Sequence, residues 1–169
     1  MARPDLEKVP SFYHNYIRQV AQDDLQQAFD HHLKDFTNVL ETVPEEKWNY
    51  RYAPDKWTIK ELVLHVIDSE RIFGYRALCI ARGETTSLPG FDENTYAANS
   101  KAEHRTKESL LKELKAVQAA TALLFRSFDE EQLQQSGIAN GKPITVNAIG
   151  FIVVGHTLHH KNILKERYL

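Results

Sequence analysis

Residues 57–83 read WTIKELVLHVIDSERIFGYRALCIARG, and this stretch carries the clearest helix signal in the chain. Thr58, followed three residues later by Glu61, forms a capping box, which marks a helix start. Gly83 is a typical helix stop. Between these signals one face recurs at spacings of three and four and is mostly apolar: Leu62, His65, Val66, Ser69, Phe73 and Ile80. The stretch therefore predicts one long amphipathic helix whose inner face lies in a core.

Three more segments have the same helical period, over residues 24–42, residues 106–128, and residue 145 to nearly the C-terminus. Their inner faces are Leu25, Phe29, His32, Phe36, Val39 and Leu40 in the first, Leu110, Leu114, Val117, Thr121 and Leu124 in the second, and Ile149, Val153, His156, His160, Ile163 and Leu164 in the third. Four such helices predict an all-α protein, an antiparallel four-helix bundle. A length of 169 residues without an internal linker predicts one domain over residues 1–169.

The connections between these helices differ in length and composition. Residues 84–105, which include LPGFDENTY at 88–96, form a long loop between the second and third helices. Loops of this length in a compact domain are usually functional or disordered. In GIANGKPIT, residues 137–145, the Asn140-Gly141 pair predicts a tight hairpin turn. The aromatic residues 11–20 are expected to lie across the end of the bundle.

Composition and charge exclude several classes of protein. The net charge is −2, so the chain lacks the basic excess of a general nucleic-acid binder. The longest apolar run, residues 148–155, is far shorter than the roughly 20 residues of a membrane span. No apolar stretch of signal-peptide length occurs near the N-terminus. Cys79 is the single cysteine and cannot form an internal disulfide, which fits a reducing compartment. We expect a cytoplasmic protein that binds neither nucleic acid nor membrane.

Three histidines interrupt the apolar inner faces and form a candidate metal site. His156 and His160 are four residues apart, so they lie on one helix face one turn apart. His65 on the second helix can supply a third imidazole. Three nitrogen ligands leave positions open for water or substrate, as in catalytic metal sites. The alternative is that each is an ordinary hydrogen-bonded core histidine.

Other residues have weaker claims to this site. His32, on an inner face, is the main rival ligand, and His159 lies about 100° round the helix from His160 and is expected to serve packing or an interface. Cys79 lies about 21 Å along the helix axis from His65, which favours an inert thiol. Trp48 and Trp57 are expected to cap the core. We expect three histidines at the surface: His14, His31 and His104.

Three carboxylates, Asp68, Asp92 and Glu93, could support the histidines. Asp92 and Glu93, in the long loop, are candidate general bases on metal-bound water, and the alternative is that both are solvated. Asp68 could accept a hydrogen bond from a metal-bound histidine, although a salt bridge is its more ordinary role. Glu61 is already explained by the capping box. Tyr96, in the same loop, is a further remote candidate.

Residues 57–83 and 88–96, together with GHTLHHKNIL at 155–164, resemble the DinB-like superfamily of four-helix metal-dependent enzymes. The resemblance covers nearly the whole chain in the same order. It implies that one divalent ion is held by a histidine of the second helix and an H-x-x-x-H pair of the last, which here are His65, His156 and His160. Imidazole ligands accept Zn, Ni, Fe or Mn, so the identity of the metal stays open. The resemblance also implies a homodimer and a small-molecule substrate.

The same resemblance implies two kinds of reaction. Some members of the wider superfamily resemble transferases or isomerases that use a low-molecular-weight thiol, and others resemble metal-dependent hydrolases. We place transfer of such a thiol to an electrophile ahead of hydrolysis, because a shell of neutral imidazoles leaves the ion cationic and able to ionise an incoming thiol. Two alternatives are a non-catalytic stress-response protein that binds a metal or small ligand, and a helical interaction protein with core histidines.

Overall fold

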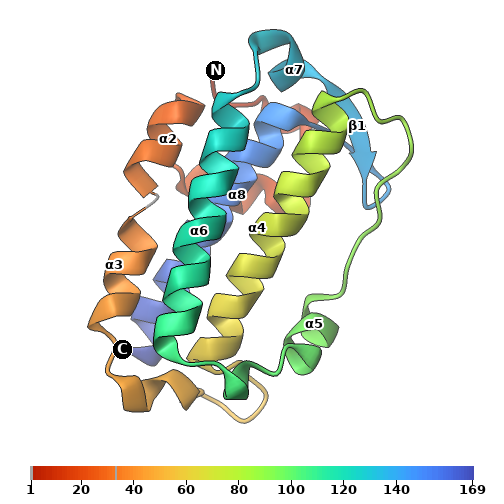
Figure 1. Ribbon diagram of the computed structural model, residues 1–169. Coiled ribbons are helices and arrows are strands. Elements are labelled where there is room, and N and C mark those ends of the chain that lie inside the picture. Colours follow the sequence, from red (N-terminus) through yellow and green to blue (C-terminus); the bar gives the residue numbers. More distant parts are fainter. Residues whose placement is uncertain (1, 33) are drawn as a thin grey trace.

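The computed structural model describes residues 2–32 and 34–169, and it is a four-helix bundle (Figure 1). One edge is formed by two short helices in succession, α2 (Leu25–His32) and α3 (Asp35–Thr42). The other three positions are taken by α4 (Ile59–Ala81), α6 (Lys107–Arg126) and α8 (Val146–Ile163). The predicted fold class is confirmed. The segment expected as one helix over residues 24–42 is two helices, with residue 33 outside the described part.

Local hydrogen bonds explain where the three long helices begin. The side chains of Thr58, Thr106 and Thr145 each accept a hydrogen bond from the amide three residues on, at 3.2, 3.1 and 3.2 Å. At Thr58 the capping box is complete, because Glu61 also accepts a hydrogen bond from the Thr58 amide. Gly83, just beyond α4, has a φ of +84°, which is a conformation that favours glycine. These predicted helix boundaries are confirmed.

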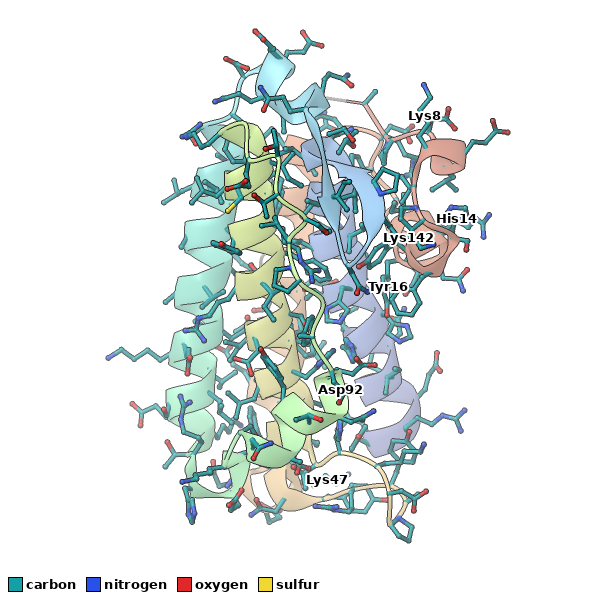
Figure 2. All side chains as sticks on the ribbon, turned by 90° about the vertical axis from the view of Figure 1, so that its right-hand side faces the viewer. Lys8, His14, Tyr16, Lys47, Asp92 and Lys142 are labelled. Carbon is teal, nitrogen blue, oxygen red and sulfur yellow. The ribbon has the colours of Figure 1, made fainter. Side chains whose placement is uncertain are left out.

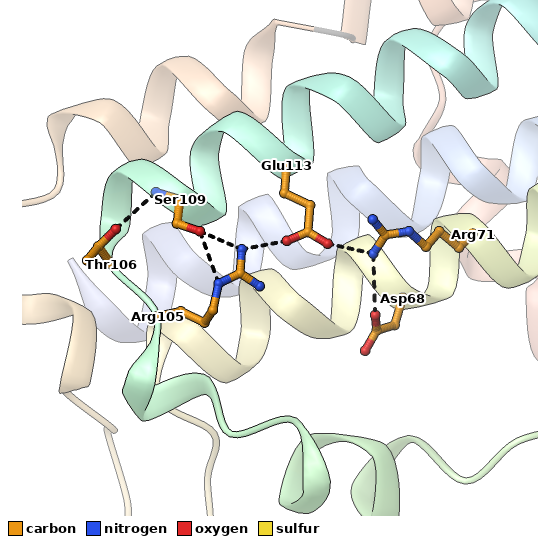
Figure 3. Close-up of polar contacts among 6 residues, drawn as sticks. All are labelled: Asp68, Arg71, Arg105, Thr106, Ser109 and Glu113. Carbon is orange, nitrogen blue, oxygen red and sulfur yellow. Dashed lines mark hydrogen bonds and ion pairs between the residues drawn. The ribbon is translucent and has the colours of Figure 1, made fainter.

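The helices α4 and α6 run in the same direction, whereas α8 runs antiparallel to α4 (Figure 1). Lys60, at the start of α4, donates to the carbonyl of Glu103, just before α6 begins, at 3.3 Å. Further along, Arg71 of α4 forms an ion pair with Glu113 of α6 at 2.7 Å (Figure 3). The antiparallel expectation therefore holds for α4 and α8. The chain can place α6 parallel to α4 because the connection between them returns along the full length of the bundle.

That connection is more structured than a loop. It contains the helix α5 (Glu93–Asn99) and a 3-10 turn (Ala102–His104). Nearer its start, Leu88 donates to the carbonyl of Ile138 at 2.8 Å and accepts from the amide of Asn140 at 2.9 Å. The connection is thus hydrogen-bonded to the hairpin near its start and helical near its end, so the predicted long loop between α4 and α6 is present and contains short helical segments.

The hairpin predicted around Asn140-Gly141 is present. Its strands are β1 (Ser136–Ala139) and β2 (Lys142–Thr145), and they pair antiparallel. Asn140 and Gly141 both have positive φ, 51° and 69°, as a two-residue turn of this kind requires. A short helix, α7 (Glu130–Gln134), precedes β1, so the hairpin links the end of α6 to the start of α8.

The aromatic N-terminal segment lies against the side of α8 and not across the bundle end. It contains 3-10 turns at Leu6–Lys8 and Ser11–Tyr13, followed by α1 (His14–Gln19). Figure 2 shows Tyr16 between α1 and α8. Gly155, at the middle of α8, makes this approach possible, because a Cβ there would lie 2.1 Å from the carbonyl oxygen of Tyr16. The absence of a side chain at one glycine therefore sets the position of α1.

The helix α8 is the centre of the molecule. Every residue from Val146 to Leu158 is buried, so α8 has no solvent face over this length, whereas the sequence predicted a single inner stripe.

The buried apolar residues form two clusters, one around Phe73 and Phe151 and one around Trp48 and Leu62. The chain ends in a π-helical turn, Leu164–Tyr168, and a 3-10 turn, Glu45–Asn49, precedes α4. Among the described helices, none combines the length and apolar character that crossing a bilayer requires.

Candidate metal centre

The three predicted metal ligands come together between α4 and α8. Nε2 of His156 lies 3.0 Å from Nε2 of His65 and 3.1 Å from Nε2 of His160. One ligand atom from each of the three residues lies within 4.8 Å of the other two. Within the described part of the chain, this is the one group of three or more His, Cys, Asp or Glu side chains with such convergence.

Neighbouring aromatic rings hold the imidazoles in place. The ring of Trp57 lies 4.6 Å from the ring of His65, centroid to centroid. The ring of Tyr16, from α1, makes an edge contact with His156 at 5.4 Å. Phe73, two turns along α4 from His65, lies 5.9 Å from His156. Packing from three different segments therefore restricts the rotation of the imidazoles.

The site favours the neutral form of each histidine. Burial, with a smaller contribution from His159, lowers the pKa of His65 to about 4. Burial also lowers the pKa values of His156 and His160 well below the usual value, and the neighbouring histidines add to both shifts. All three imidazoles are therefore neutral at pH 7, which is the form that binds metal ions.

These residues fit a divalent cation. An imidazole nitrogen carries either one proton or one lone pair, so Nε2 of His156 can satisfy only one of its two neighbours by a hydrogen bond. A cation between the three Nε2 atoms would satisfy every lone pair. Two nitrogens bound at about 2.0–2.1 Å, roughly 90–109° apart, stand roughly 2.9–3.4 Å from each other. The observed separations of 3.0 and 3.1 Å lie in this range.

The imidazole nitrogens that point away from the proposed metal ion do not all have hydrogen-bond partners. Nδ1 of His160 is buried and has no hydrogen-bond partner among the described residues, although metal-bound histidines usually donate this proton. Asp68, the candidate partner of His65, instead faces Arg71 at 3.9 Å, the salt-bridge role that was its alternative (Figure 3). Burial raises the pKa of the Asp68 carboxyl.

The rival ligand His32 lies elsewhere. Its Nε2 contacts Oε1 of Gln22 at 3.1 Å, and it lines a separate small cavity together with Glu70 and Gln118. Burial lowers the pKa of His32 to about 4. It is buried, as predicted, but it does not belong to the convergent group.

The three remaining predicted surface histidines differ from one another. His31 and His104 are exposed, whereas His14 is half-buried and its Nε2 lies 2.8 Å from the carbonyl oxygen of Val9. Cys79 is a half-buried free thiol packed against the apolar core. None of these side chains belongs to the convergent histidine group.

A cavity of about 220 Å³ opens beside the three histidines. Most of its wall is aromatic, with a few polar side chains. The residues that line it are Phe12, Tyr13, Tyr16, Trp57, His65, Ser69, Phe73, Arg76, Phe91, Glu93, Asn140, His156, His159 and His160. The cavity can therefore hold a small molecule next to the histidine cluster, as expected of a catalytic metal site.

The structure separates the two candidate general bases. Asp92 is fully exposed and caps α5 by accepting a hydrogen bond from the Thr95 amide at 2.6 Å, and this bond lowers the pKa of its carboxyl (Figure 2). Glu93 lines the cavity. Its charge adds to the effect of burial in raising the pKa of Tyr16. Tyr96 is exposed and contacts Phe91 at 5.1 Å. Of the three candidate residues Asp92, Glu93 and Tyr96, only Glu93 lines the cavity with the histidines.

Comparison with known families adds an independent line of evidence. Residues 28–164 match the model of the DinB superfamily. The chain belongs to the DinB superfamily. The match includes α4, α8 and all three convergent histidines, and leaves out α1.

Individual relatives agree with this membership. A protein of Oceanobacillus iheyensis, provisionally named as a metal-dependent hydrolase, is 25% identical over 149 residues, which are 87% of this chain and 80% of that protein. The structure of YfiT from Bacillus subtilis has a TM-score of 0.72 at 18% identity and covers 96% of this chain and 89% of YfiT. YfiT is described provisionally as a metal-dependent hydrolase with an unusual four-helix bundle topology. The DinB-like protein YjoA, also from Bacillus subtilis, has a TM-score of 0.59 at 22% identity over 83% of this chain and 87% of YjoA.

Several cavity residues of this DinB-superfamily chain were not predicted from the sequence. Trp57 and His159, assigned to core capping and to packing, line the cavity. Tyr13 and Tyr16 reach the site because α1 packs on Gly155. Gly155 directly precedes His156 in the sequence. A glycine at this position could have indicated that another segment packs closely against the last helix. Nothing in the sequence indicated that Arg76 lines the cavity, because an arginine near a helix end is usually solvated.

Proposed function

We propose that the protein is a metal-dependent enzyme whose single divalent ion is held by His65, His156 and His160. The observation that carries this proposal is the convergence of three neutral Nε2 atoms at the wall of a small-molecule cavity. The three-imidazole donor set accepts Zn, Ni, Fe or Mn. When bound, the ion supplies Lewis acidity, which lowers the pKa of a water or thiol enough to make it a nucleophile near pH 7.

The chain's own residues would prepare the site for this chemistry. The neutral imidazoles add no charge to that of the ion. The aromatic side chains of Tyr16, Trp57 and Phe73 line the cavity, where they would contact the apolar part of a substrate beside the ligands. Electrostatic interactions are stronger near such low-dielectric walls than in solvent.

We place transfer of a low-molecular-weight thiol to an electrophile first. The wall carries no cysteine, and Cys79 packs against the apolar core. The thiol would therefore come from a small cofactor. The sulfur of the thiolate would form the new bond to an electrophilic carbon, the leaving group would depart with the electron pair, and the thiol proton would pass to solvent.

Hydrolysis is the second candidate, and two observations favour it. Glu93 brings a carboxylate to the cavity wall, where it could accept a proton from the attacking water. The relatives YfiT and the Oceanobacillus iheyensis protein are also both described provisionally as metal-dependent hydrolases. A stress-response protein that holds a metal without turnover is the non-catalytic alternative.

Elemental analysis of untagged protein is the first test, because a histidine tag would itself recruit metal. We expect one divalent ion per chain. The loaded protein is then offered a bromoalkyl reporter with several low-molecular-weight thiols. Metal-dependent conjugation that is lost in His160→Ala supports thiol transfer. Metal-dependent ester or amide hydrolysis without conjugation supports the hydrolase, and neither activity leaves a metal-binding protein.

We also propose that the substrate is a small molecule. We further propose that the protein is a cytoplasmic homodimer with a single domain over residues 1–169. The cavity supports the first, and family resemblance and composition support the others. Light scattering at micromolar protein concentration tests the dimer, and a monomer would contradict it.

A further inference from the structure

Arg76 is a buried cation in the wall of the cavity beside the three histidines. Its side chain is 4% exposed. Its Nη2 donates to the carbonyl oxygen of Pro89 at 2.7 Å, and its guanidinium lies 5.8 Å from the ring of Phe73. Among residues 2–32 and 34–169, no carboxylate lies within ion-pair distance of it. Buried charges are normally paired, so this arrangement needs an explanation.

Three other arginines, Arg3, Arg71 and Arg105, show the contrast. Arg71 and Arg105 share the carboxylate of Glu113, at 2.7 and 2.6 Å (Figure 3). Arg3 pairs with Asp23 at 3.0 Å. The side chains of these three arginines are 29–50% exposed, and each has a carboxylate partner although water can already solvate it. The most buried of these four cations has none.

The guanidinium of Arg76 has more N–H donors than the one hydrogen-bond acceptor with which it is paired. A guanidinium has five N–H donors, and the carbonyl of Pro89 occupies one of them. About two turns earlier in α4, Ser69 lines the same cavity, and its buried Oγ has no hydrogen-bond partner among the described residues. Two polar side chains on one helix face therefore present unused hydrogen-bonding groups to the cavity.

Arg76 lies close to the histidine cluster. The ring of Phe73 is 5.8 Å from the guanidinium and 5.9 Å from the ring of His156. One aromatic ring therefore separates the cation from the imidazole. A compact molecule in the cavity can face Arg76 with one end and the histidines with the other.

We propose that Arg76 binds the carboxylate of a small substrate whose apolar body lies among the aromatic side chains of the cavity. This inference rests on the proposed function, since it names the substrate class for the same site. A carboxylate matches the planar guanidinium with two parallel hydrogen bonds. Ser69 can donate a third.

A monoanion suits the site better than a phosphate dianion. One negative charge neutralises one guanidinium. In the metal-free protein a second negative charge would lie uncompensated between aromatic walls, in a cavity that Glu93 already makes more negative. The cavity volume, about 220 Å³, also limits the ligand to a small molecule.

Binding to metal-free protein tests the inference directly, because a carboxylate can also ligate a metal ion. The probes are 3-phenylpropanoate, its neutral analogue 3-phenylpropanamide, and phenyl phosphate. Affinities come from calorimetry, and Trp57 fluorescence reports binding in the cavity, since its ring contacts His65. Arg76→Gln removes the charge but keeps a donor for the Pro89 carbonyl. Arg71→Gln is the matched control on the same helix, outside the cavity wall.

We expect wild-type protein to bind the carboxylate about tenfold or more tightly than the amide, as hydrogen bonds to charged groups allow. Arg76→Gln should reduce this preference to below about twofold, and Arg71→Gln should keep it. Arg76→Lys, which retains the charge, should keep a preference even if Arg76→Gln folds poorly. Equal binding of carboxylate and amide by wild type, a preference that survives in folded Arg76→Gln, or tighter binding of phenyl phosphate would each overturn the inference.

These outcomes are distinguishable from those of the proposed function. Binding is measured without metal and without turnover. Carboxylate selectivity without any metal-dependent reaction would leave this inference standing, whereas metal-dependent turnover without carboxylate selectivity would leave only the proposed function.

Discussion

Nε2 of His156 lies 3.0 Å from Nε2 of His65, although the two residues are 91 positions apart in the chain. The contact joins the middle of α8 to the first half of α4, two antiparallel helices that pack side by side. A metal ion at this point would cross-link the two helices. The site is therefore coupled to the packing of the bundle.

Removing one ligand should remove the metal and leave the fold. We expect His156→Ala to weaken metal binding by about 100-fold or more, because even changes to residues behind the ligands typically cost 10–100-fold. Elemental analysis and circular dichroism measure the two effects. His159→Ala, at a cavity residue outside the convergent group, is the control and should keep its metal. Full metal content in His156→Ala would show that the ligands lie elsewhere.

Gly155 should tolerate no side chain. A Cβ there would lie 2.1 Å from the carbonyl oxygen of Tyr16, so Gly155→Ala must displace α1, at a cost of about 1–3 kcal/mol or more. Gly74→Ala is the matched control, because its Cβ would meet Thr121 Oγ1 at an ordinary 4.0 Å and alanine favours helix by about 1 kcal/mol. Denaturant unfolding should show opposite signs for the two variants. Equal stabilities would contradict the close packing of α1 on α8.

Glu70 should make the protein less stable as pH rises. Burial raises the pKa of its carboxyl to about 7, against 4.5 for the ordinary group. The folded state therefore keeps a proton that the unfolded state releases, and stability falls between pH 4.5 and about 7 and is constant above. The penalty at pH 8 is about 3 kcal/mol by linkage.

The variant Glu70→Gln isolates this contribution. It should be more stable than wild type at pH 8 and differ little at pH 4.5, in denaturant titrations at several pH values. A difference between the two proteins that does not vary with pH would contradict the assignment.

His32 should have the opposite pH dependence. Burial lowers the pKa of His32 to about 4. Below pH 6.5 the unfolded state therefore binds a proton that the folded state does not bind. The stability that neutral His32 contributes is present above pH 6.5 and is lost as pH falls towards 4. His32→Gln should reduce the acid sensitivity and retain one metal per chain. Loss of the metal in this variant would restore His32 as a ligand.

Asp92 and Glu93 should differ in their effects on any hydrolytic activity. Glu93→Gln should lower metal-dependent hydrolysis about 100-fold if Glu93 is the general base. Asp92→Asn should leave the rate unchanged, because Asp92 caps α5 and, unlike Glu93, does not line the cavity. Asp92→Ala should cost about 1 kcal/mol through the lost cap. A larger rate effect at Asp92 than at Glu93 would contradict the placement of the two carboxylates.

Local signals explain the parts of the structure that were predictable. Thr58 with Glu61, and the threonines before α6 and α8, mark helix starts because their hydrogen bonds reach only three residues. The Asn140-Gly141 turn is set by two positive φ values in adjacent residues. His156 and His160 share a helix face for the same local reason.

The sequence by itself determined α4, α6 and α8, the hairpin and the histidine pair, since each depends on interactions within one or two turns of chain. The tertiary structure decided which remote side chains meet. It brought His65 to the pair through the register of α4 against α8, moved His32 to a separate cavity, and buried Arg76 without a carboxylate partner. These outcomes follow from how helices pack and how connections run, and no short-range pattern encodes a distance between residues that are far apart in the chain.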